Sequence, residues 1–299
     1  MRYLFEEVQC CEMCGSDKQY HKIMGQRMNC SQGLSPKKNI GISVTVLQCN
    51  SCKLIYSSPM PIPFDINDHY GVPPENYWKE SYFKHDPKYF ETQLDTLSLL
   101  QPIKPGLKAL DVGAGVGKCM LNLSIAGYDT FGFEPSEPFY ERAISKMNIP
   151  KEKLKLGKIE DVDYEENSFD FITFGAVVEH LYHPAACIKK ALSWLKPGGI
   201  IQIEVPNAKH LISKLINRYF NYRGGNCVTN LSPMHSPFHL YEFDLESFNK
   251  LGEKLNFKVV KHHYDVCELF FIPKFLHFVF NKYMQHTNSG LQLTVWLKK

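Results

Sequence analysis

Four cysteines near the N-terminus have the type and spacing of a metal site. Cys11-Glu-Met-Cys14 is one Cys-x-x-Cys pair, and Cys49-Asn-Ser-Cys52 is a second pair with 34 residues between the two. Two such pairs supply four thiolates, which complete a tetrahedral zinc site and leave no position open for chemistry. We therefore expect a structural zinc ion. Unrelated free thiols are the alternative interpretation.

A glycine-rich segment is the second candidate site. Leu110-Asp-Val-Gly-Ala-Gly-Val-Gly117 stands between a predicted strand and a predicted helix. Gly113 and Gly115 let the backbone turn sharply and approach a ligand closely, and the following helix offers free N–H groups. The spacing is G-x-G-x-G, unlike the G-x-G-x-x-G of dinucleotide-binding folds. Glu134 ends the next predicted strand, where a carboxylate can accept hydrogen bonds from both hydroxyls of a ribose.

These motifs together resemble the class I S-adenosylmethionine-dependent methyltransferases. The pattern D-x-G-x-G-x-G, the acid that closes the second strand, Phe169-Asp-Phe-Ile and Leu195-Lys-Pro-Gly-Gly199 follow one another in the family's order over about residues 105–265. The resemblance implies an enzyme that uses S-adenosylmethionine. It also implies an α/β fold with a Rossmann-like seven-stranded sheet whose last strand is antiparallel, and Leu291–Leu297 fits that strand.

The resemblance also carries over a set of cofactor-binding residues. Asp111 would face the ammonium group of the methionine tail, since a carboxylate attracts a cation and would repel a pyrophosphate. Glu134 would hold the ribose. The adenine would meet the backbone of Ile159 and the side chain of Glu160, with Asp161 as the alternative. The other members follow the same strands and glycines: Gly113, Ala114, Gly115, Gly117, Pro135, Gly175, Ala176 and Val177.

Methyl transfer to a hydroxyl needs a base, and histidine is the side chain whose ordinary pKa lies near neutrality. Val178-Glu-His-Leu181 resembles a segment of ubiquinone-type O-methyltransferases, which makes His180 a catalytic candidate. A helix-start histidine bonded to the backbone is the alternative. His239-Leu-Tyr241 resembles a His-x-Tyr segment that lines the acceptor pocket in relatives, so His239 and Tyr241 complete the candidates. His183 is more typical of a helix cap.

The segment 207–241 holds three histidines and no acid. Its basic residues are Lys209, Lys214, Arg218 and Arg223. Insertions at this place cover the active site as a lid in the resembled family, and an acid-free lid suits an anionic acceptor. The alternative interpretation is an amphipathic helix with a solvated basic face.

Alternating strands and helices must position these residues. The hydrophobic pattern predicts strands over 109–112, 130–133, 169–174, 200–205 and 257–262, and helices over 118–126, 136–147, 184–195 and 244–255. Such alternation is typical of a mostly parallel sheet with helices on both faces. The expected organisation has three parts: a zinc-ribbon-like module over 1–60, a connector with a helix over 61–104, and a methyltransferase domain over 105–299 with the lid 207–241.

Composition and charge exclude some classes of protein. A hydrophobic share of 44% with 22% charged residues is typical of a folded chain and not of a disordered one. The longest apolar run, Leu269–Phe280, is too short to span a bilayer. We therefore expect a cytoplasmic protein without membrane contact, in which reduced cysteines bind metal. Residues 1–60 hold seven Lys or Arg and four Asp or Glu, so 7 − 4 = +3.

A four-cysteine module ahead of such a domain resembles the deoxysugar methyltransferases of surface-polysaccharide and antibiotic pathways. The leading hypothesis is methyl transfer to a small anionic metabolite, such as a nucleotide-linked sugar, with carbon, oxygen and nitrogen all open as acceptor. An RNA-modifying enzyme that binds RNA through the zinc module is the alternative. Four thiolates and Zn²⁺ add −4 + 2 = −2, which lowers the module's charge to about +1 and weakens that alternative. A fold that only senses the cofactor is a third hypothesis, which the intact glycines disfavour.

Overall fold

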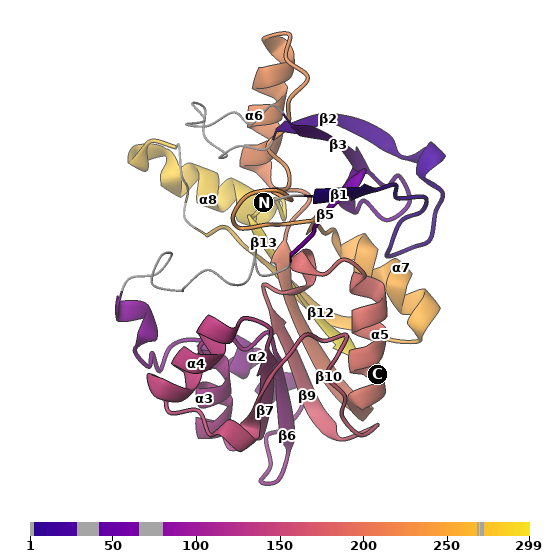
Figure 1. Ribbon diagram of the computed structural model, residues 1–299. Helices are drawn as coiled ribbons and strands as arrows, with labels where there is room; N and C mark the ends of the chain where they lie inside the picture. Colours follow the sequence, from indigo (N-terminus) through magenta and orange to yellow (C-terminus); the bar gives the residue numbers. More distant parts are fainter. Residues whose placement is uncertain (1–2, 29–41, 66–79, 268, 270–271) are drawn as a thin grey trace.

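The computed structural model describes residues 3–28, 42–65, 80–267, 269 and 272–299. A seven-stranded sheet forms its centre, in the strand order β12-β13-β10-β9-β6-β7-β8 (Figure 1). The strands are β6 (Lys108–Val112), β7 (Asp129–Glu134), β8 (Leu154–Leu156), β9 (Phe169–Gly175), β10 (Leu195–Pro206), β12 (Lys258–Asp265) and β13 (Gln292–Lys298). β6 to β10 pair in parallel, whereas β13 is antiparallel to both β10 and β12. The expected Rossmann-like fold with an antiparallel last strand is therefore confirmed.

Helices cover both faces of this sheet. These are α2 (Glu91–Leu100), α3 (Lys118–Ile125), α4 (Glu137–Ser145), α5 (Pro184–Trp194) and α7 (Leu245–Leu255), whereas α6 (Leu211–Tyr222) and α8 (His277–His286) lie beyond the end of the sheet. Short 3₁₀ turns complete the helical part: η1 (Lys18–Tyr20), η3 (Glu80–Phe83), η4 (Lys151–Lys153), η5 (Val178–His180) and η6 (Lys274–Leu276). Figure 1 shows α2, α3 and α4 on one side and α5 and α7 on the other. No described helix is long and apolar enough to cross a bilayer.

Two elements of the expected methyltransferase domain, outside the segment 207–241, had no clear sequence signal. β8 is only three residues long and was not predicted. The apolar run 269–280 continues into α8, in which only Met284 is buried. Pro273 lies within the run and interrupts the periodic pattern that a helix would show, so the sequence does not indicate where α8 begins. The packing of Met284 against Ile212 of α6 stabilises α8 in its place.

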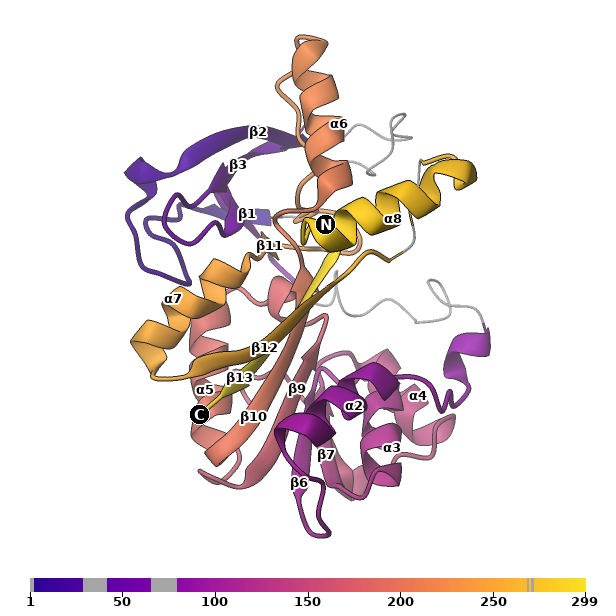
Figure 2. The ribbon, with the colours of Figure 1, turned by 180° about the vertical axis from the view of Figure 1, so that it is seen from behind.

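A second sheet joins the N-terminal segment to the segment 207–241. Its order is β11-β4-β3-β2, built from β2 (Lys22–Met28), β3 (Ser43–Gln48), β4 (Ile55–Ser58) and β11 (Tyr241–Glu242). A further pair, β1 (Tyr3–Glu6) with β5 (Met60–Pro63), lies beside it. In β11, Tyr241 pairs with Tyr56 of β4. Figure 2 shows this sheet at the same end of the molecule as α6.

Candidate functional site

The glycine-rich loop joins β6 to α3 and requires its glycines for two reasons. Gly113, Gly115 and Gly117 all have positive φ angles, of 68°, 55° and 82°, a region that side chains with a Cβ rarely occupy. A Cβ on Gly113 would lie 2.7 Å from Cγ2 of Val177, and a Cβ on Gly117 would lie 2.6 Å from Cγ1 of Ile149. The loop is therefore held tightly against the end of β9, as a close approach of backbone to ligand requires.

Glu134 and Asp111 are the two carboxyl groups at this loop, and both are buried. Glu134 accepts hydrogen bonds from the N–H of Gly115 at 2.7 Å and of Ser136 at 2.8 Å. Burial nevertheless raises the pKa of Glu134 to about 7. Burial and the charge of Glu134 raise the pKa of Asp111 to about 8, and its Oδ2 has no partner among the described residues. A cation beside them would favour the ionised forms.

A cavity of about 100 Å³ lies against Asp111 and the glycine loop. Its lining combines the loop with α2 and the ends of β9 and β10: Tyr89, Phe90, Gln93, Asp111, Gly113, Ala114, Cys119, Thr173, Gly175 and Glu204. Glu204 accepts a hydrogen bond from Gln93 at 3.2 Å, and burial raises its pKa. The sequence did not single out Gln93 or Glu204 as site residues, because they meet only where the connector helix packs on the sheet.

Tyr82 covers the outer side of the glycine loop. Its ring lies 4.2 Å from Nζ of Lys118, and its hydroxyl lies 4.0 Å from the position that a Cβ on Gly115 would take. Burial and the charge of Glu134 raise the pKa of Tyr82 to about 12, so this hydroxyl is a hydrogen-bond donor at neutral pH. The aromatic cover thus comes from the connector between the two sheets.

The residues expected near the adenine do not all face the same part of the protein. Pro135 is half-buried after β7, and Gly157 N–H donates to the carbonyl of Glu134 at 3.0 Å. Ile159 is buried in the core. Glu160 lies 3.8 Å from Sγ of Cys187 on α5, so its carboxylate is directed toward that helix. The backbone near Ile159 is the part of this segment that stays close to Glu134.

A much larger cavity, of about 610 Å³, opens beyond the end of β9. Its lining residues come from β10, α6, the segment 229–242 and the start of β13: Ala176, Glu179, Val205, Pro206, Asn207, His210, Ile212, Ser213, Ile216, Thr229, Leu231, Pro237, His239, Glu242, Cys267, Leu269, Leu291 and Gln292. Apolar side chains predominate, and no Lys or Arg is part of this described lining. The basic residues of the segment 207–241 therefore lie elsewhere.

The placement of those basic residues follows from α6. Lys214 and Arg218 lie on the exposed side of this helix, whereas Ile212 is buried toward the cavity. Lys209 forms an ion pair with Asp244 at 2.8 Å. The amphipathic-helix interpretation describes α6 better than a basic wall over the ligand does. The cavity lining therefore does not support the inference that the acid-free segment 207–241 indicates an anionic acceptor.

Three candidate proton-transfer groups converge at the wall of the larger cavity. His180 ends η5 and His239 comes from the segment 229–242, and their rings lie 5.0 Å apart. Nε2 of each histidine lies 4.0 Å from Oε1 of the buried Glu179. Nδ1 of His180 lies 3.2 Å from the carbonyl oxygen of Phe238. The fold therefore brings together two histidines that are 59 residues apart in the chain (239 − 180 = 59).

Burial sets the charge of this cluster. It raises the pKa of Glu179 to about 8. It lowers the pKa of His180 to about 4, and burial together with His180 and His235 lowers the pKa of His239 to about 3. Both imidazoles are therefore neutral at pH 7 and have a nitrogen that can accept a proton. Glu179 was part of a quoted motif but was not selected from the sequence, although it lies between the two histidines.

The remaining two candidates lie outside this cluster. His183 is largely exposed and lies 3.3 Å from Oε1 of Glu12, at the start of α5. Tyr241 is buried, and its hydroxyl donates to the carbonyl of Tyr182 at 3.0 Å. Tyr241 does not line the larger cavity. Tyr241 thus lies between β4 and η5, and its part in catalysis stays a prediction.

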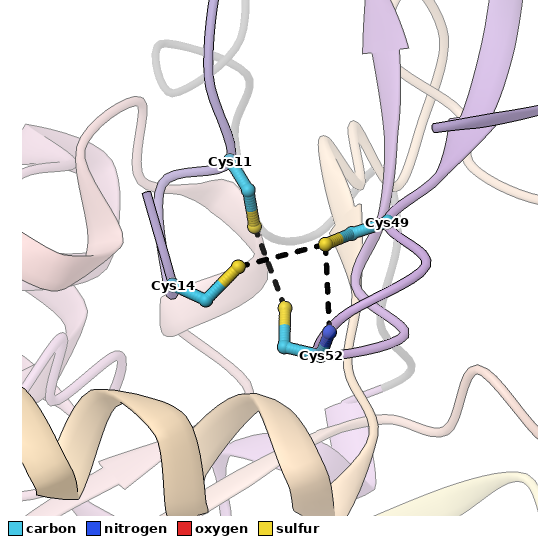
Figure 3. A group of neighbouring side chains, drawn as sticks. All are labelled: Cys11, Cys14, Cys49 and Cys52. Atoms are coloured by element: carbon cyan, nitrogen blue, oxygen red, sulfur yellow. Dashed lines mark hydrogen bonds between the residues drawn. The ribbon is translucent and has the colours of Figure 1, made fainter. Parts of the chain in front are cut away.

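The four N-terminal cysteines form a compact group of free thiols (Figure 3). Sγ of Cys11 lies 3.4 Å from Sγ of Cys52, and Sγ of Cys14 lies 3.5 Å from Sγ of Cys49. All four sulfurs lie within 4.8 Å of one another. Contacts with the other sulfurs, then burial, raise the pKa of the Cys11 thiol far above its usual range. Four ionised sulfurs at these distances need a central cation, and zinc–sulfur bonds of about 2.3 Å would match this spacing.

The parallel sheet, the glycine loop and the buried Glu134 define the class of this fold, which is that of S-adenosylmethionine-dependent methyltransferases. A family model described as a methyltransferase domain matches residues 82–262, more than half of the chain. The chain therefore belongs to this methyltransferase family.

Individual relatives agree with the family at lower coverage. A ubiquinone biosynthesis O-methyltransferase of Bradyrhizobium diazoefficiens is 30% identical over 122 residues, covering 40% of this chain and 46% of the relative. A demethylmenaquinone methyltransferase of Staphylococcus aureus is 32% identical over 103 residues, covering 33% of this chain and 43% of the relative. The chain thus spans less than half the length of these curated relatives.

A solved structure supports the fold alone. Phosphoethanolamine N-methyltransferase 2 of Haemonchus contortus, in complex with S-adenosyl-L-methionine, superimposes with a TM-score of 0.51. The alignment covers 82% of this chain and 62% of that chain, at 15% identity.

Proposed function

We propose that the protein is an enzyme that transfers a methyl group from S-adenosylmethionine to a small molecule bound in the cavity of about 610 Å³. The single observation that supports this proposal best is the adjacency of two sites. Gly175 lines the small cavity at the glycine loop, and the next residue, Ala176, lines the large one. A donor and an acceptor that meet at this point of the chain would be close enough to react in line.

The residues at the glycine loop fit the cofactor. Glu134 would accept the ribose hydroxyls with the lone pairs that Gly115 and Ser136 leave free. Asp111, whose Oδ2 has no partner among the described residues, would face the positive methionine tail. Pro135 and Ile159 would lie toward the adenine. The residues along the tail would be Gly113, Ala114, Gly117, Gly175, Ala176 and Val177. Glu160 is a weaker candidate because of its contact with Cys187. When bound, the cofactor supplies an electrophilic methyl group.

His239 is the proposed proton acceptor, and His180 and Glu179 support it. His239 lines the cavity and is neutral at pH 7, so a ring nitrogen is available, although its pKa of about 3 makes it a weak base by itself. Glu179 lies within 4.0 Å of both histidines; when His239 takes a proton, the imidazolium would favour the ionised form of Glu179, and that carboxylate would in turn raise the basicity of His239.

The acceptor that this cavity favours is an uncharged, hydroxyl-bearing molecule with an apolar part. The lining is mostly apolar, and its acidic groups are the carboxyl groups of Glu179 and Glu242, whose pKa values are raised by burial. A diphosphate would find no Lys or Arg among these described lining residues to offset its charge. The names of two relatives refer to ubiquinone and demethylmenaquinone, which agrees with such an acceptor. The nucleotide-linked sugar expected from the sequence is the competing acceptor in the same assay.

We also propose that Cys11, Cys14, Cys49 and Cys52 hold a structural zinc ion. Two of the described basic residues of this region give no support to the alternative that it binds RNA. Lys18 forms an ion pair with Glu7, and Arg27 is buried beneath the segment 226–231, so neither is a free basic surface for a phosphate backbone.

Radiolabelled S-adenosylmethionine and a panel of acceptors test the assignment. We expect label transfer to phenols or hydroxyquinones with an apolar substituent, and none to nucleotide-linked sugars. Transfer to the sugars alone would refute the acceptor class while leaving the enzyme class intact.

His239→Gln tests the proton acceptor in the same assay. Loss of a general base lowers kcat by about 10²- to 10⁴-fold, while calorimetric binding of S-adenosylmethionine stays unchanged. The matched control is His183→Gln, since His183 is a largely exposed histidine near the cluster. An unaffected His239→Gln enzyme would exclude this residue as the base.

A further inference from the structure

The end of β2, in the N-terminal module, forms backbone hydrogen bonds with the segment 226–240, which carries His239. The N–H of Gln26 donates to the carbonyl of Asn226 at 2.8 Å, and the N–H of Val228 donates to the carbonyl of Gln26 at 3.0 Å. Gly25 permits this approach, because a Cβ there would lie 2.9 Å from Cγ1 of Val228 and 3.1 Å from the Asn226 carbonyl oxygen. The segment therefore extends the small sheet from a different part of the sequence.

Arg27 anchors the next part of the same segment. Its side chain is only 5% exposed. Nε donates to the carbonyl of Leu231 at 2.8 Å, and Nη2 donates to Nε2 of His235 at 2.9 Å. Because a guanidinium only donates, Nε2 of His235 must be the accepting nitrogen of a neutral ring. A buried guanidinium in this position fixes the direction of two acceptors at once.

The two anchored residues lead directly to His239. The N–H of Ser232 donates to the carbonyl of His239 at 2.9 Å, and the N–H of His239 donates to Oγ of Ser232 at 3.1 Å. The N–H of Phe238 donates to the carbonyl of His235 at 2.8 Å, and the Phe238 carbonyl lies at Nδ1 of His180. Displacement of Leu231 or His235 would therefore displace both histidines of the proposed proton-transfer cluster.

The cavity wall depends on the same contacts. Leu231, Pro237, His239 and Glu242 all line the cavity of about 610 Å³. Glu242 accepts from the N–H of Leu231 at 2.9 Å and from Nδ2 of Asn230 at 2.5 Å, and the charge of Arg27 offsets part of the cost of burying this carboxylate.

We propose that Arg27 is a positioning residue of the acceptor site, and that the N-terminal module serves to hold the segment 226–240 in the conformation that directs His239 to the acceptor. The module is then a wall of the active site and not a separate binding domain. This inference rests on the proposed function only in taking the large cavity as the acceptor site.

Amide hydrogen exchange of the full-length protein tests the proposal without an acceptor. Arg27→Ala should speed exchange in the segment 226–240 by about tenfold or more, while β6 and β9 keep their protection. Calorimetric binding of S-adenosylmethionine should change by less than about twofold, since the glycine loop is a separate site. Lys18→Ala is the control, because Lys18 is a module cation outside these contacts.

Histidine ring NMR signals give a second readout that a merely stabilising residue would not move selectively. Arg27→Ala should shift the signals of His235 and His239. Arg27→Lys should shift them less, since lysine keeps the charge and loses the two-pronged geometry. If Arg27→Ala fails to fold, Arg27→Lys and His235→Gln carry the same test.

Unchanged exchange and unchanged signals in Arg27→Ala would overturn the proposal. So would an equal increase of exchange in β6 and β9, which would indicate a general loss of stability. Faster exchange of the segment with unchanged methyl transfer would show that Arg27 anchors the segment without positioning the acceptor site, and would also overturn the proposal.

Discussion

The buried carboxyl groups of Asp111 and Glu134 are the residues on which cofactor binding should depend most. Their pKa values are raised to about 8 and about 7 by burial without a cation. A bound cation lowers both pKa values again, so binding near neutrality must release protons. A positive ligand would thus offset part of the free energy that burial of these carboxyl groups costs.

The affinity for S-adenosylmethionine should therefore rise with pH. At pH 6 both carboxyl groups are largely protonated and must lose protons to bind the cation, whereas Asp111 is fully ionised only about one pH unit above its pKa of about 8. We expect affinity to increase by about tenfold or more between pH 6 and pH 8 and to level off only above about pH 9. Calorimetry in buffers of different ionisation enthalpy measures the affinity and the released protons together.

Asp111→Asn provides the matched control for this titration, because the amide keeps the shape and cannot ionise. Its pH dependence should be shallower and its affinity lower at pH 8. An affinity that stays constant from pH 6 to pH 8 in the unmodified protein, with no proton release, would contradict the role given to these groups.

Helix α7 is the element that connects the N-terminal module to the large sheet. Asp244 caps it, accepting from the N–H of Glu246 at 3.0 Å, and also pairs with Lys209. Oγ of Ser247 donates to the carbonyl of Cys52 at 2.8 Å, which links the second cysteine pair to the first turn of the helix. The cap thus fixes both the helix and its contact with the module.

Asp244→Ala should destabilise the protein by about 1–2 kcal/mol, the usual cost of a lost N-cap. Asp244→Asn should cost less, since an asparagine side chain can still accept the capping hydrogen bond. Urea unfolding of the two variants measures the difference. Equal stability of Asp244→Ala and the unmodified protein would show that the cap contributes nothing here.

In the described part of the chain, the seven-stranded sheet and the four-stranded sheet, with the β1-β5 pair beside the latter, both contribute residues near the cavity of about 610 Å³. Strand β11 belongs to the small sheet, and the residue just before it, Leu240, donates its N–H to the carbonyl of Glu179. We therefore expect that a structural change in the N-terminal module displaces Glu179, His180 and His239 through a few hydrogen bonds.

Metal removal should loosen the small sheet first. We expect about one zinc per chain from the four thiolates, and Cys49→Ser should lose it together with protection of β3, β4 and β11 against hydrogen exchange. Binding of S-adenosylmethionine should persist, because the glycine loop lies in the large sheet. Zinc analysis and exchange measure these effects. Cys10→Ser is the control, since Cys10 is exposed and outside the cluster.

The sequence by itself determined the class of fold and the cofactor end of the site. The glycine loop, Asp111 and the acid ending β7 depend on a turn and two short strands, and contacts this local leave a pattern in the order of residues. The predicted strands and helices of the large sheet were confirmed for the same reason, because buried parallel strands appear as apolar runs. The weakly patterned β8 and α8 were missed.

Only the tertiary structure decided how the acceptor end is built. Arg27 and His235 are 208 residues apart, and Gln93 and Glu204 are 111 apart. No local periodicity records such pairs, since packing of whole elements brings them together. The same reason explains the basic residues of segment 207–241. Their charge was readable from the sequence, but the face of α6 that turns inward was not, and it is the apolar face that meets the cavity.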